Sequence, residues 1–252
     1  MPYKPLRQPG ESIFYEALDV LENDLNPTMV GFALSVGLAL YTWFTYFLGV
    51  PPLVNAVIAT LLCLGMTLHA LPKLRRAKAT LAKLKQAKEG ERIVAEYLDA
   101  LRDEGCYVMH DLMGDKFNVD HVVIGPHGVF TVETKTISKP LKGSAKVLYD
   151  GERLTVGGFS PERDPIAQAQ HQAAWLRRLL KGSTGKSFQV KPVVVYPGWY
   201  VAQTAKTLKS GVWVLEPKML EGRVKREALS LSAEEVHLVH HHLKLHMRAV
   251  AL

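Results

Sequence analysis

The sequence predicts an α/β domain, with a central mixed β-sheet flanked by helices, preceded by two transmembrane helices. Three observations support this prediction. Two long runs without charged residues lie near the N-terminus. They are followed by a basic stretch in which leucine and alanine recur at helical spacing. From Cys106 onward, short strand-like segments alternate with helical segments, which is typical of a sheet packed against helices.

The charge of the chain is divided unevenly. The formal net charge is +7 with a pI near 9.3. Residues 1–72 hold two basic and five acidic residues, a net charge of −3, which leaves +10 for the remainder. A basic domain suits an anionic partner, either nucleic acid or a lipid surface. The cysteines, Cys63 and Cys106, form neither a disulfide framework nor a zinc pattern, so we expect a reducing compartment.

The first two helices are expected to form a membrane hairpin. Residues 28–50 contain no charge and would span about 34 Å as a helix, enough to cross a hydrocarbon core of about 30 Å. Pro51 and Pro52 then break the helix, and residues 53–72 form a second uncharged run. The alternative is a pair of buried core helices. The length of the runs and their aromatic residues near one end favour the membrane. The late start of the first run, the acidic segment before it and its length argue against a cleaved signal peptide.

The basic stretch after the second run predicts the orientation. The connection between the runs is uncharged, whereas seven basic residues follow the second run: Lys73, Arg75, Arg76, Lys78, Lys83, Lys85 and Lys88. The positive-inside rule places this stretch, the following domain and both termini in the cytoplasm, at the cell (inner) membrane. The lysines can bind anionic lipid head groups or collect DNA, and we favour lipid.

Helical spacing continues through this stretch, and a second helix is expected to open at Glu91 and to stop at Gly105. We expect the chain to divide into five parts. They are an N-terminal cytoplasmic segment (1–27), the transmembrane hairpin (28–72), a basic juxtamembrane helix (73–89), an α/β domain (90–200) and a C-terminal extension that packs on this domain (201–252).

The domain itself begins with three expected strands, at residues 107–112, 119–124 and 129–135. A hairpin is expected over 146–149 and 153–156, with Asp150 and Gly151 at its turn. A helix should follow Asp164 and Pro165 and end near Gly182. Two further strands, 191–197 and 212–217, precede a last helix that starts at a capping box, Ser232 to Glu235, and runs to about Ala249.

Three charged residues stand out in the hairpin from Asp120 to Lys135. If its turn is centred between Pro126 and His127, Asp120 faces Glu133 on the neighbouring strand. Lys135 is two residues beyond Glu133, so the three side chains share one face of the sheet. The alternative is a structural ion pair on a solvated face, which is a common and nearly cost-free arrangement.

Two carboxylates and an ammonium group on one face suit the hydrolysis of a phosphodiester. The carboxylates can hold Mg²⁺, which polarises the phosphorus centre and lowers the pKa of a bound water. The lysine can orient or deprotonate that water, or stabilise the charge that develops on the phosphate. On geometry alone, a metal-dependent phosphodiesterase and a structural ion pair therefore stay equally open.

Asp120 followed by Glu133-Thr-Lys135 resembles the D…(D/E)xK signature of the restriction-endonuclease-like nucleases. A longer ordered pattern resembles the nuclease-related domain, NERD, over about residues 88–200. This pattern consists of Gly90-Glu91, Asn118-Val-Asp120-His121, Gly125-Pro-His-Gly-Val-Phe130, Glu133-Thr-Lys135 and Asp164-Pro-Ile-Ala-Gln168-Ala.

The resemblance implies a restriction-endonuclease-like core and assigns roles to five residues. Asp120 and Glu133 would be metal ligands, Lys135 the catalytic lysine, Glu91 an accessory acid at the metal, and Gln168 a residue on a helix flanking the site, able to touch substrate or metal water. Mg²⁺ is the expected ion, with Mn²⁺ as a substitute. The chain has Gln172 where the exonuclease branch often has a tyrosine, which argues against a close link to that branch.

We therefore interpret the chain as a membrane-anchored, Mg²⁺-dependent deoxyribonuclease of the endonuclease type, with RNA as an alternative substrate and its oligomeric state open. The second hypothesis is a membrane-tethered nucleic-acid-binding or scaffold protein with a non-catalytic nuclease-like fold. A third is a structural membrane protein whose basic stretch binds lipid.

Three weaker signals are assigned structural roles. We expect Gly182 to Ser187 to be a helix end and loop rather than a phosphate loop, because the first glycine of that motif is missing. The five histidines between His237 and His246 are expected to be solvated helix residues. His121 is expected to pack in the core, and Trp199 and Tyr200 are equally suited to stacking on bases and to packing at the rim.

Overall fold

The computed structural model describes residues 7–49, 53–139, 145–202 and 210–250. The chain forms two compact units. One unit is Ile13–Lys85, and the other joins Met1–Ser12 to Gln86–Leu252. The short segment before the hairpin therefore belongs to the unit that contains the sheet, although 73 residues separate the two parts of that unit in the sequence.

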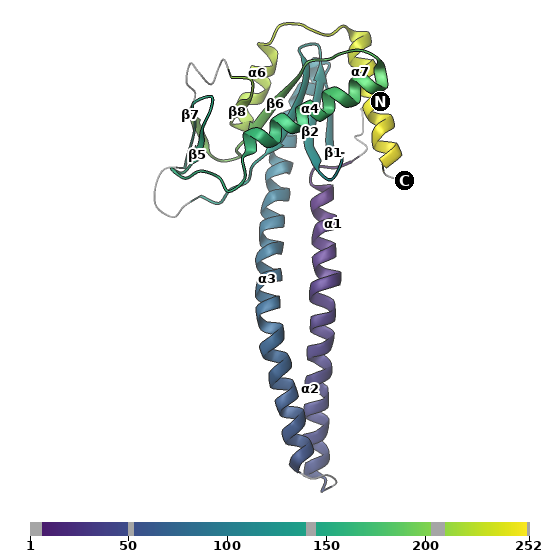
Figure 1. Cartoon of the computed structure of the whole chain (residues 1–252), viewed down its shortest axis with the longest axis vertical. Coiled ribbons are helices and arrows are strands. Elements are labelled where there is room, and N and C mark those ends of the chain that lie inside the picture. Colours follow the sequence, from purple (N-terminus) through teal and green to yellow (C-terminus); the bar gives the residue numbers. More distant parts are fainter. Residues whose placement is uncertain (1–6, 50–52, 140–144, 203–209, 251–252) are drawn as a thin grey trace. The chain divides into compact units, whose positions relative to one another are not determined.

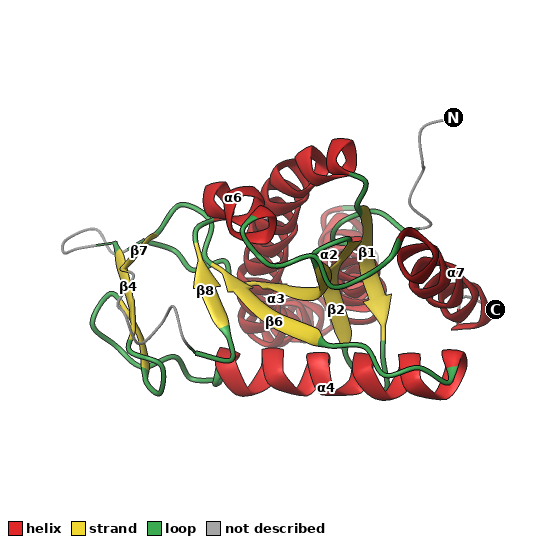
Figure 2. Ribbon diagram, turned by 90° about the horizontal axis from the view of Figure 1, so that it is seen from above, coloured by secondary structure: helices red, strands yellow, loops and turns green. Residues whose placement is uncertain are grey.

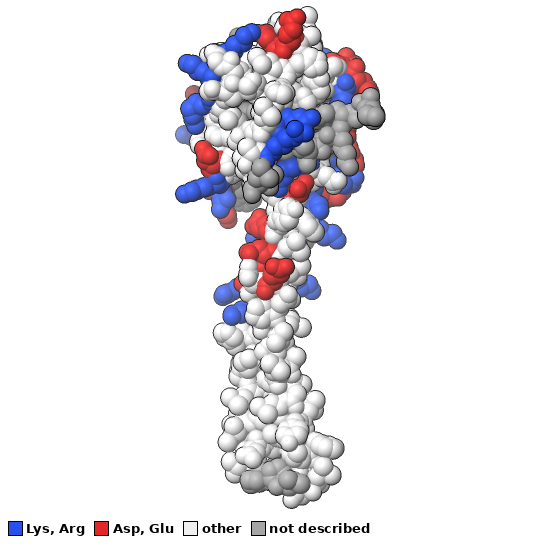
Figure 3. Space-filling model, turned by 90° about the vertical axis from the view of Figure 1, so that its right-hand side faces the viewer, with Lys and Arg blue, Asp and Glu red and all other residues white. Residues whose placement is uncertain are grey.

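The helical unit is built from long apolar helices (Figure 1). These helices are α1 (Glu11–Asp19), a π-helical stretch η1 (Val20–Leu25), α2 (Asn26–Phe47) and the first part of α3 (Leu53–Asp99). Two helical segments are long and apolar enough to cross a membrane, by length and composition, and few of their residues are buried. The uncharged stretch forms a continuous white surface in Figure 3. The expected helix break at Pro51 and Pro52 lies outside the described residues.

The expected start of a second helix at Glu91 is wrong, because α3 continues without interruption from Leu53 to Asp99. Gly90 is instead a packing position. A Cβ atom there would lie 2.0 Å from Oγ1 of Thr136, so only glycine lets the helix approach this segment so closely. The expected stop at Gly105 is confirmed, since Gly105 has φ +76° and ends the 3-10 helix η2 (Ala100–Glu104).

The sheet unit contains a five-stranded mixed sheet in the order β1-β2-β3-β6-β8 (Figure 2). Its strands are β1 (Tyr107–Met113), β2 (Asn118–Gly125), β3 (Gly128–Thr134), β6 (Val190–Val195) and β8 (Trp213–Leu215). The first three strands run antiparallel, and β6 and β8 add in parallel. The predicted α/β class with a mixed sheet is confirmed.

The register of the hairpin agrees with the sequence analysis. Gly125 pairs with Gly128 and His121 with Val132, as a turn centred between Pro126 and His127 requires. A smaller sheet in the order β5-β4-β7 lies on the β8 side of the large sheet (Figure 2), with β4 (Lys146–Tyr149), β5 (Leu154–Val156) and β7 (Tyr200–Ala202). Sequence analysis did not foresee β7, which is only three residues long.

Helices cover both faces of the large sheet (Figure 2). On one face, α4 (Pro165–Thr184) and α7 (Ala233–Val250) share a core with the strands. On the other face lie the end of α3 and α6 (Leu220–Lys225), which follows the short 3-10 helix η3 (Pro217–Met219). The Asp164 side chain caps α4, and the expected capping box of α7 is present, with Ser232 and Glu235 exchanging hydrogen bonds of 3.2 Å.

Candidate active site

Glu133 is the centre of the candidate site. It is the penultimate residue of β3 and is only 4% exposed. Its Oε1 accepts hydrogen bonds from Lys135 Nζ and Gln168 Nε2, both at 2.7 Å, and its Oε2 accepts one of 2.6 Å from Gln172 Nε2. A buried carboxylate is costly unless it is paired and hydrogen-bonded, and these three donors meet that requirement.

Hydrogen bonds hold both the backbone and the side-chain ammonium group of Lys135. Its backbone N–H donates to Val195 O at 2.8 Å, so the backbone continues to pair with β6 beyond the end of β3. Its Nζ donates to Glu133 and to Gln168 Oε1, the latter at 2.8 Å. Glu133, Lys135 and Gln168 therefore form a closed triangle of hydrogen bonds, and the lysine side chain remains partly open to solvent.

Asp120 lies on β2, next to this triangle. Its Oδ2 accepts a 2.7 Å hydrogen bond from the backbone N–H of Thr134, which links the end of β3 to β2. Burial, and then repulsion from Glu133 and Glu91, raise the pKa of Asp120 well above its usual range. The N–H of Thr134 and the charge of Lys135 oppose that shift. The structure thus brings Asp120 and Glu133 into one charged group.

Glu91 reaches the same group from α3. Burial, followed by repulsion from Asp111, raises the pKa of Glu91 to about 7, with a smaller contribution from Glu133. The close packing at Gly90 is what brings this part of the helix to the strand end. Four acidic side chains from α3, β1, β2 and β3 therefore influence one another across the site.

The donor set fits a hard divalent cation held by few protein ligands. Among the described residues, no three His, Cys, Asp or Glu side chains are grouped closely enough to hold a metal ion. Mg²⁺ keeps several waters and is usually bound through one or two carboxylates, which Asp120 and Glu133 supply. A cation would also relieve the repulsion that raises the pKa of Asp120. The role of Glu91 as a third ligand stays a prediction.

Comparison with known proteins identifies the domain that contains these residues. Residues 86–197 match the family model of the nuclease-related domain, NERD. The chain carries a NERD domain. It is also 38% identical over 66 residues to an uncharacterized protein of Bacillus anthracis, an alignment that covers 24% of this chain and 31% of that protein. The chain thus spans about a third of the length of this relative. No solved structure matches the chain.

The NERD domain contains site residues that sequence analysis missed. Gln172 is 1% exposed and bridges Glu133 to the backbone carbonyl of Asn118 at 3.0 Å. In the sequence, Gln172 stood out only as a departure from a family pattern. Its position four residues after Gln168 could have placed both amides on the same helix face. Asp111, 1% exposed on β1, is a second missed residue, and no motif marked it.

The histidines that stood out in the sequence include residues with packing roles. His121 is fully buried, and its Nδ1 lies 2.9 Å from Nδ1 of His110, so the expected core role is confirmed. The expectation of solvated histidines on α7 is wrong in part, because His240 stacks on Tyr107 and His246 lies 2.8 Å from Met113 O.

Two other weak signals are also settled. The helix end before the loop is confirmed, although its C-cap is Gly185 rather than Gly182. Trp199 is buried and donates to Ile137 O at 2.9 Å, which is rim packing, whereas the neighbouring Tyr200 is 60% exposed.

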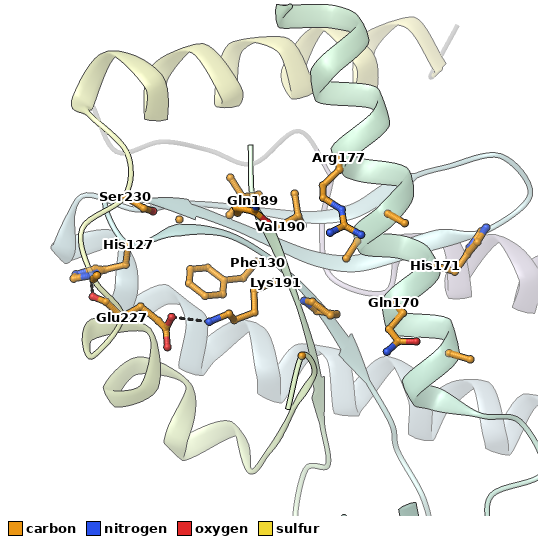
Figure 4. Close-up of a pocket in the computed structure, with 18 residues that line it drawn as sticks. His127, Phe130, Gln170, His171, Arg177, Gln189, Val190, Lys191, Glu227 and Ser230 are labelled. Carbon is orange, nitrogen blue, oxygen red and sulfur yellow. Dashed lines mark hydrogen bonds and ion pairs between the residues drawn. The ribbon is translucent and has the colours of Figure 1, made fainter. Parts of the chain in front are cut away.

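A cavity of about 830 Å³ lies between α4 and the segment around Glu227 to Ser230 (Figure 4). Arg177 points into it from the helix, and Lys191 in its wall pairs with Glu227 at 2.6 Å. Gln168 and Arg177 are nine residues apart, which places them on nearly opposite sides of a helix that turns by about 100° per residue. The cavity is therefore separate from the group around Glu133.

Proposed function

We propose that this chain is a membrane-anchored, Mg²⁺-dependent nuclease whose cytoplasmic NERD domain hydrolyses phosphodiester bonds in DNA. The observation that carries the proposal is the group of Asp120, Glu133 and Lys135 at the ends of two paired strands, inside a domain whose family is nuclease-related. The net charge of +10 after residue 72 suits the phosphate backbone, which dominates the affinity of proteins for nucleic acid.

Each residue has a role that follows from its contacts. Asp120 and Glu133 would hold the metal ion, with Glu91 as an accessory acid. A bound Mg²⁺ supplies Lewis-acid polarisation of the phosphate. Lys135, whose Nζ is fixed by Glu133 and Gln168, orients the attacking water or stabilises charge on the phosphate. Gln168 fixes the relative positions of the lysine and the carboxylate through a hydrogen bond to each.

Membrane anchoring is supported by the division of the chain. Segments on both sides of the helical unit, ending at Ser12 and starting at Gln86, belong to the same compact unit. A helix pair that leaves and re-enters one folded domain must return to the side of the membrane from which it started. Two crossings satisfy that condition, and the basic residues from Lys73 to Lys88 favour the cytoplasmic side, where anionic lipids lie.

One observation favours a second function, a membrane-tethered nucleic-acid-binding or scaffold protein without turnover. Both carboxylate oxygens of Glu133 already accept hydrogen bonds from the protein, and the charge of Lys135 is paired with the same group. A network that satisfies itself can persist as a structural element. The two functions differ in whether a metal ion displaces some of these contacts.

A cleavage assay separates the two functions. The full-length chain in lipid nanodiscs is incubated with single- and double-stranded DNA and with RNA, in Mg²⁺, Mn²⁺ or a chelator. We expect cleavage of DNA only with metal, and at least about 100-fold less of it in Glu133→Ala and Lys135→Ala. Matched controls are Glu221→Ala and Lys225→Ala, which break an exposed ion pair of 2.8 Å in the same unit.

The outcomes are distinct. Cleavage that survives chelation or both substitutions at the site contradicts the mechanism. Binding of DNA without cleavage under every metal condition supports the scaffold function. A reporter at the C-terminus that is active only outside the cytoplasm contradicts the orientation.

A further inference from the structure

We propose that Arg7 and Asp111 are positioning residues of the candidate active site. In this inference, which rests on the proposed function, residues 7–12 act as a clamp that holds Asp111 and Glu91 for metal binding. These residues directly precede the helical unit, yet they belong to the unit that contains the sheet. The N-terminal segment is thus a part of the site.

Asp111 has an unusual position on β1. His110 pairs with His121 and Leu112 with Val119, so Asp111 falls opposite Asp120 in the register. Its φ of +52° lies in the left-handed region, which L-residues adopt at a cost and which concentrates at functional sites. The side chain is 2% exposed, so its charge requires partners within the protein.

The clamp supplies those partners. Arg7 Nη2 lies 3.1 Å from Asp111 Oδ2, and the backbone N–H of Ser12 donates to the same oxygen at 2.9 Å. Arg7 is itself 14% exposed and lies 3.5 Å from Glu11. One carboxylate of the sheet is therefore bound from two points of a segment six residues long.

The same segment also reaches Glu91. The backbone of Gly10 lowers the pKa of the Glu91 carboxylate, against the effect of burial. Gly10 has φ +69°, and a Cβ atom there would lie 2.8 Å from Cγ and 3.4 Å from Cα of Lys88, on the turn of α3 before Glu91. Glycine at this position lets the clamp lie close against the helix and orient the carboxylate.

These contacts connect the clamp to the metal ligands. Asp111 lies near enough to Glu91 to repel it, and Glu91 in turn repels Asp120. Partners that orient ligands in this way usually affect metal affinity by about 10–100-fold when they are replaced. The charge of Arg7 acts in the opposite sense, because a cation near the site weakens metal binding. The sign of the effect of Arg7→Met therefore separates positioning from simple electrostatics.

The test measures Mn²⁺ binding by electron paramagnetic resonance, and DNA cleavage at saturating metal, on the full-length chain in nanodiscs. Arg7→Met, Asp111→Asn and Gly10→Ala should each weaken Mn²⁺ binding by about 10-fold, and Arg7→Lys should recover most of it. The double variant Arg7→Met/Asp111→Asn should bind Mn²⁺ no more weakly than whichever single variant has the lower affinity, because the two residues act as one unit.

Arg92→Met is the matched control. It removes the same charge one residue from Glu91, but Arg92 is an exposed residue that pairs with Glu89 and Glu96, so Mn²⁺ affinity should not change. Near-ultraviolet circular dichroism of each variant checks that the fold is retained. If Arg7→Met or Gly10→Ala loses its fold, Asp111→Asn, which preserves the size of the side chain, carries the test.

Arg7→Met that binds Mn²⁺ as tightly as the wild type, or more tightly, overturns the inference while leaving the proposed function intact. Mn²⁺ binding that weakens as expected in a chain that never cleaves DNA supports the inference and contradicts the nuclease function. A wild-type chain that binds no Mn²⁺ overturns both.

Discussion

The two units of this protein depart from the usual distribution of side chains in opposite ways. The helical unit leaves large apolar side chains exposed, with Leu34 at 70% and Phe47 at 80%. The unit with the NERD domain buries charged ones, with Asp111 at 1% and Glu133 at 4%. Soluble proteins avoid both arrangements. The comparison teaches that the same question applies to both units, namely what accommodates side chains that lie on the unusual side of the surface.

The partners differ in kind. Exposed apolar helices are stable where the solvent is hydrocarbon, so the first unit is suited to lipid. Buried carboxylates are stable where charge and donors are supplied, and here Lys135, Arg7 and two glutamine side chains supply them. In the proposed function, a divalent cation is a further partner of these carboxylates. The predictions below test each half of this comparison with matched substitutions.

The largest expected effect distinguishes exposure to lipid from exposure to water. Leu61→Arg places a charge near the middle of the second apolar run, at a side chain that is 62% exposed. Insertion of that helix should become less favourable by about 3 kcal/mol. The fraction of protein that resists carbonate extraction from membranes measures this change.

Leu229→Arg is the matched control, because Leu229 is 74% exposed in the NERD-containing unit. Extraction should stay as in the wild type for this variant. Equal behaviour of the two variants would mean that the helical unit does not meet lipid.

The next effect concerns the buried histidines behind the site. Burial, and then the charge of Arg102, lower the pKa of His110 to about 4, so the folded domain keeps it neutral. In the unfolded chain, His110 takes up a proton near pH 6.5. The contribution of neutral His110 to stability is therefore complete above that pH and is lost as the pH falls toward 4. The expected loss is about 3 kcal/mol. Urea unfolding between pH 7 and pH 4 measures it.

His110→Gln should show a shallower pH dependence than the wild type. His241→Gln, at an exposed position of α7, should keep the wild-type slope. Identical slopes in all three proteins would show that His110 does not titrate with folding.

A smaller effect is expected at Gln172, whose contact with Glu133 was not predicted from the sequence. Gln172→Leu removes the donor to Glu133 Oε2 and leaves that oxygen buried without this partner. Activity should fall by roughly 30–100-fold, or about 2–3 kcal/mol of transition-state stabilisation. The measurement is kcat/KM for DNA cleavage.

Gln170→Leu is the matched change at an exposed glutamine on the same helix, and activity should be unaffected. A loss of equal size in both variants would trace the effect to the helix rather than to Glu133.

The smallest effect compares two helical glycines. Gly90→Ala would place its methyl group against Thr136 and should destabilise the domain by about 1–2 kcal/mol, at the lower end for overpacking because a threonine side chain can turn. Gly182→Ala meets nothing within 4 Å and should stabilise α4 by up to about 1 kcal/mol. Thermal unfolding of both variants checks the opposite signs, and a shift in the same direction would contradict the packing role of Gly90.

Much of the fold could be predicted because its signals are local. The turn from Pro126 to Gly128 sets the register of β2 and β3, and the capping box at Ser232 sets the start of α7. The errors came where tertiary packing overrides local preference. Gly90 was expected to separate two helices, whereas close contact with Thr136 makes it part of one continuous helix.

The sequence by itself determined the two apolar runs, the mixed α/β class and the charged group of Asp120, Glu133 and Lys135, because period, charge and turn chemistry act between neighbours in the chain. Only the tertiary structure decided that Gln172 completes the shell of Glu133 and that Arg7 reaches Asp111. Those contacts join segments far apart in sequence. Their existence depends on how helices and strands pack, which no local pattern of residues encodes.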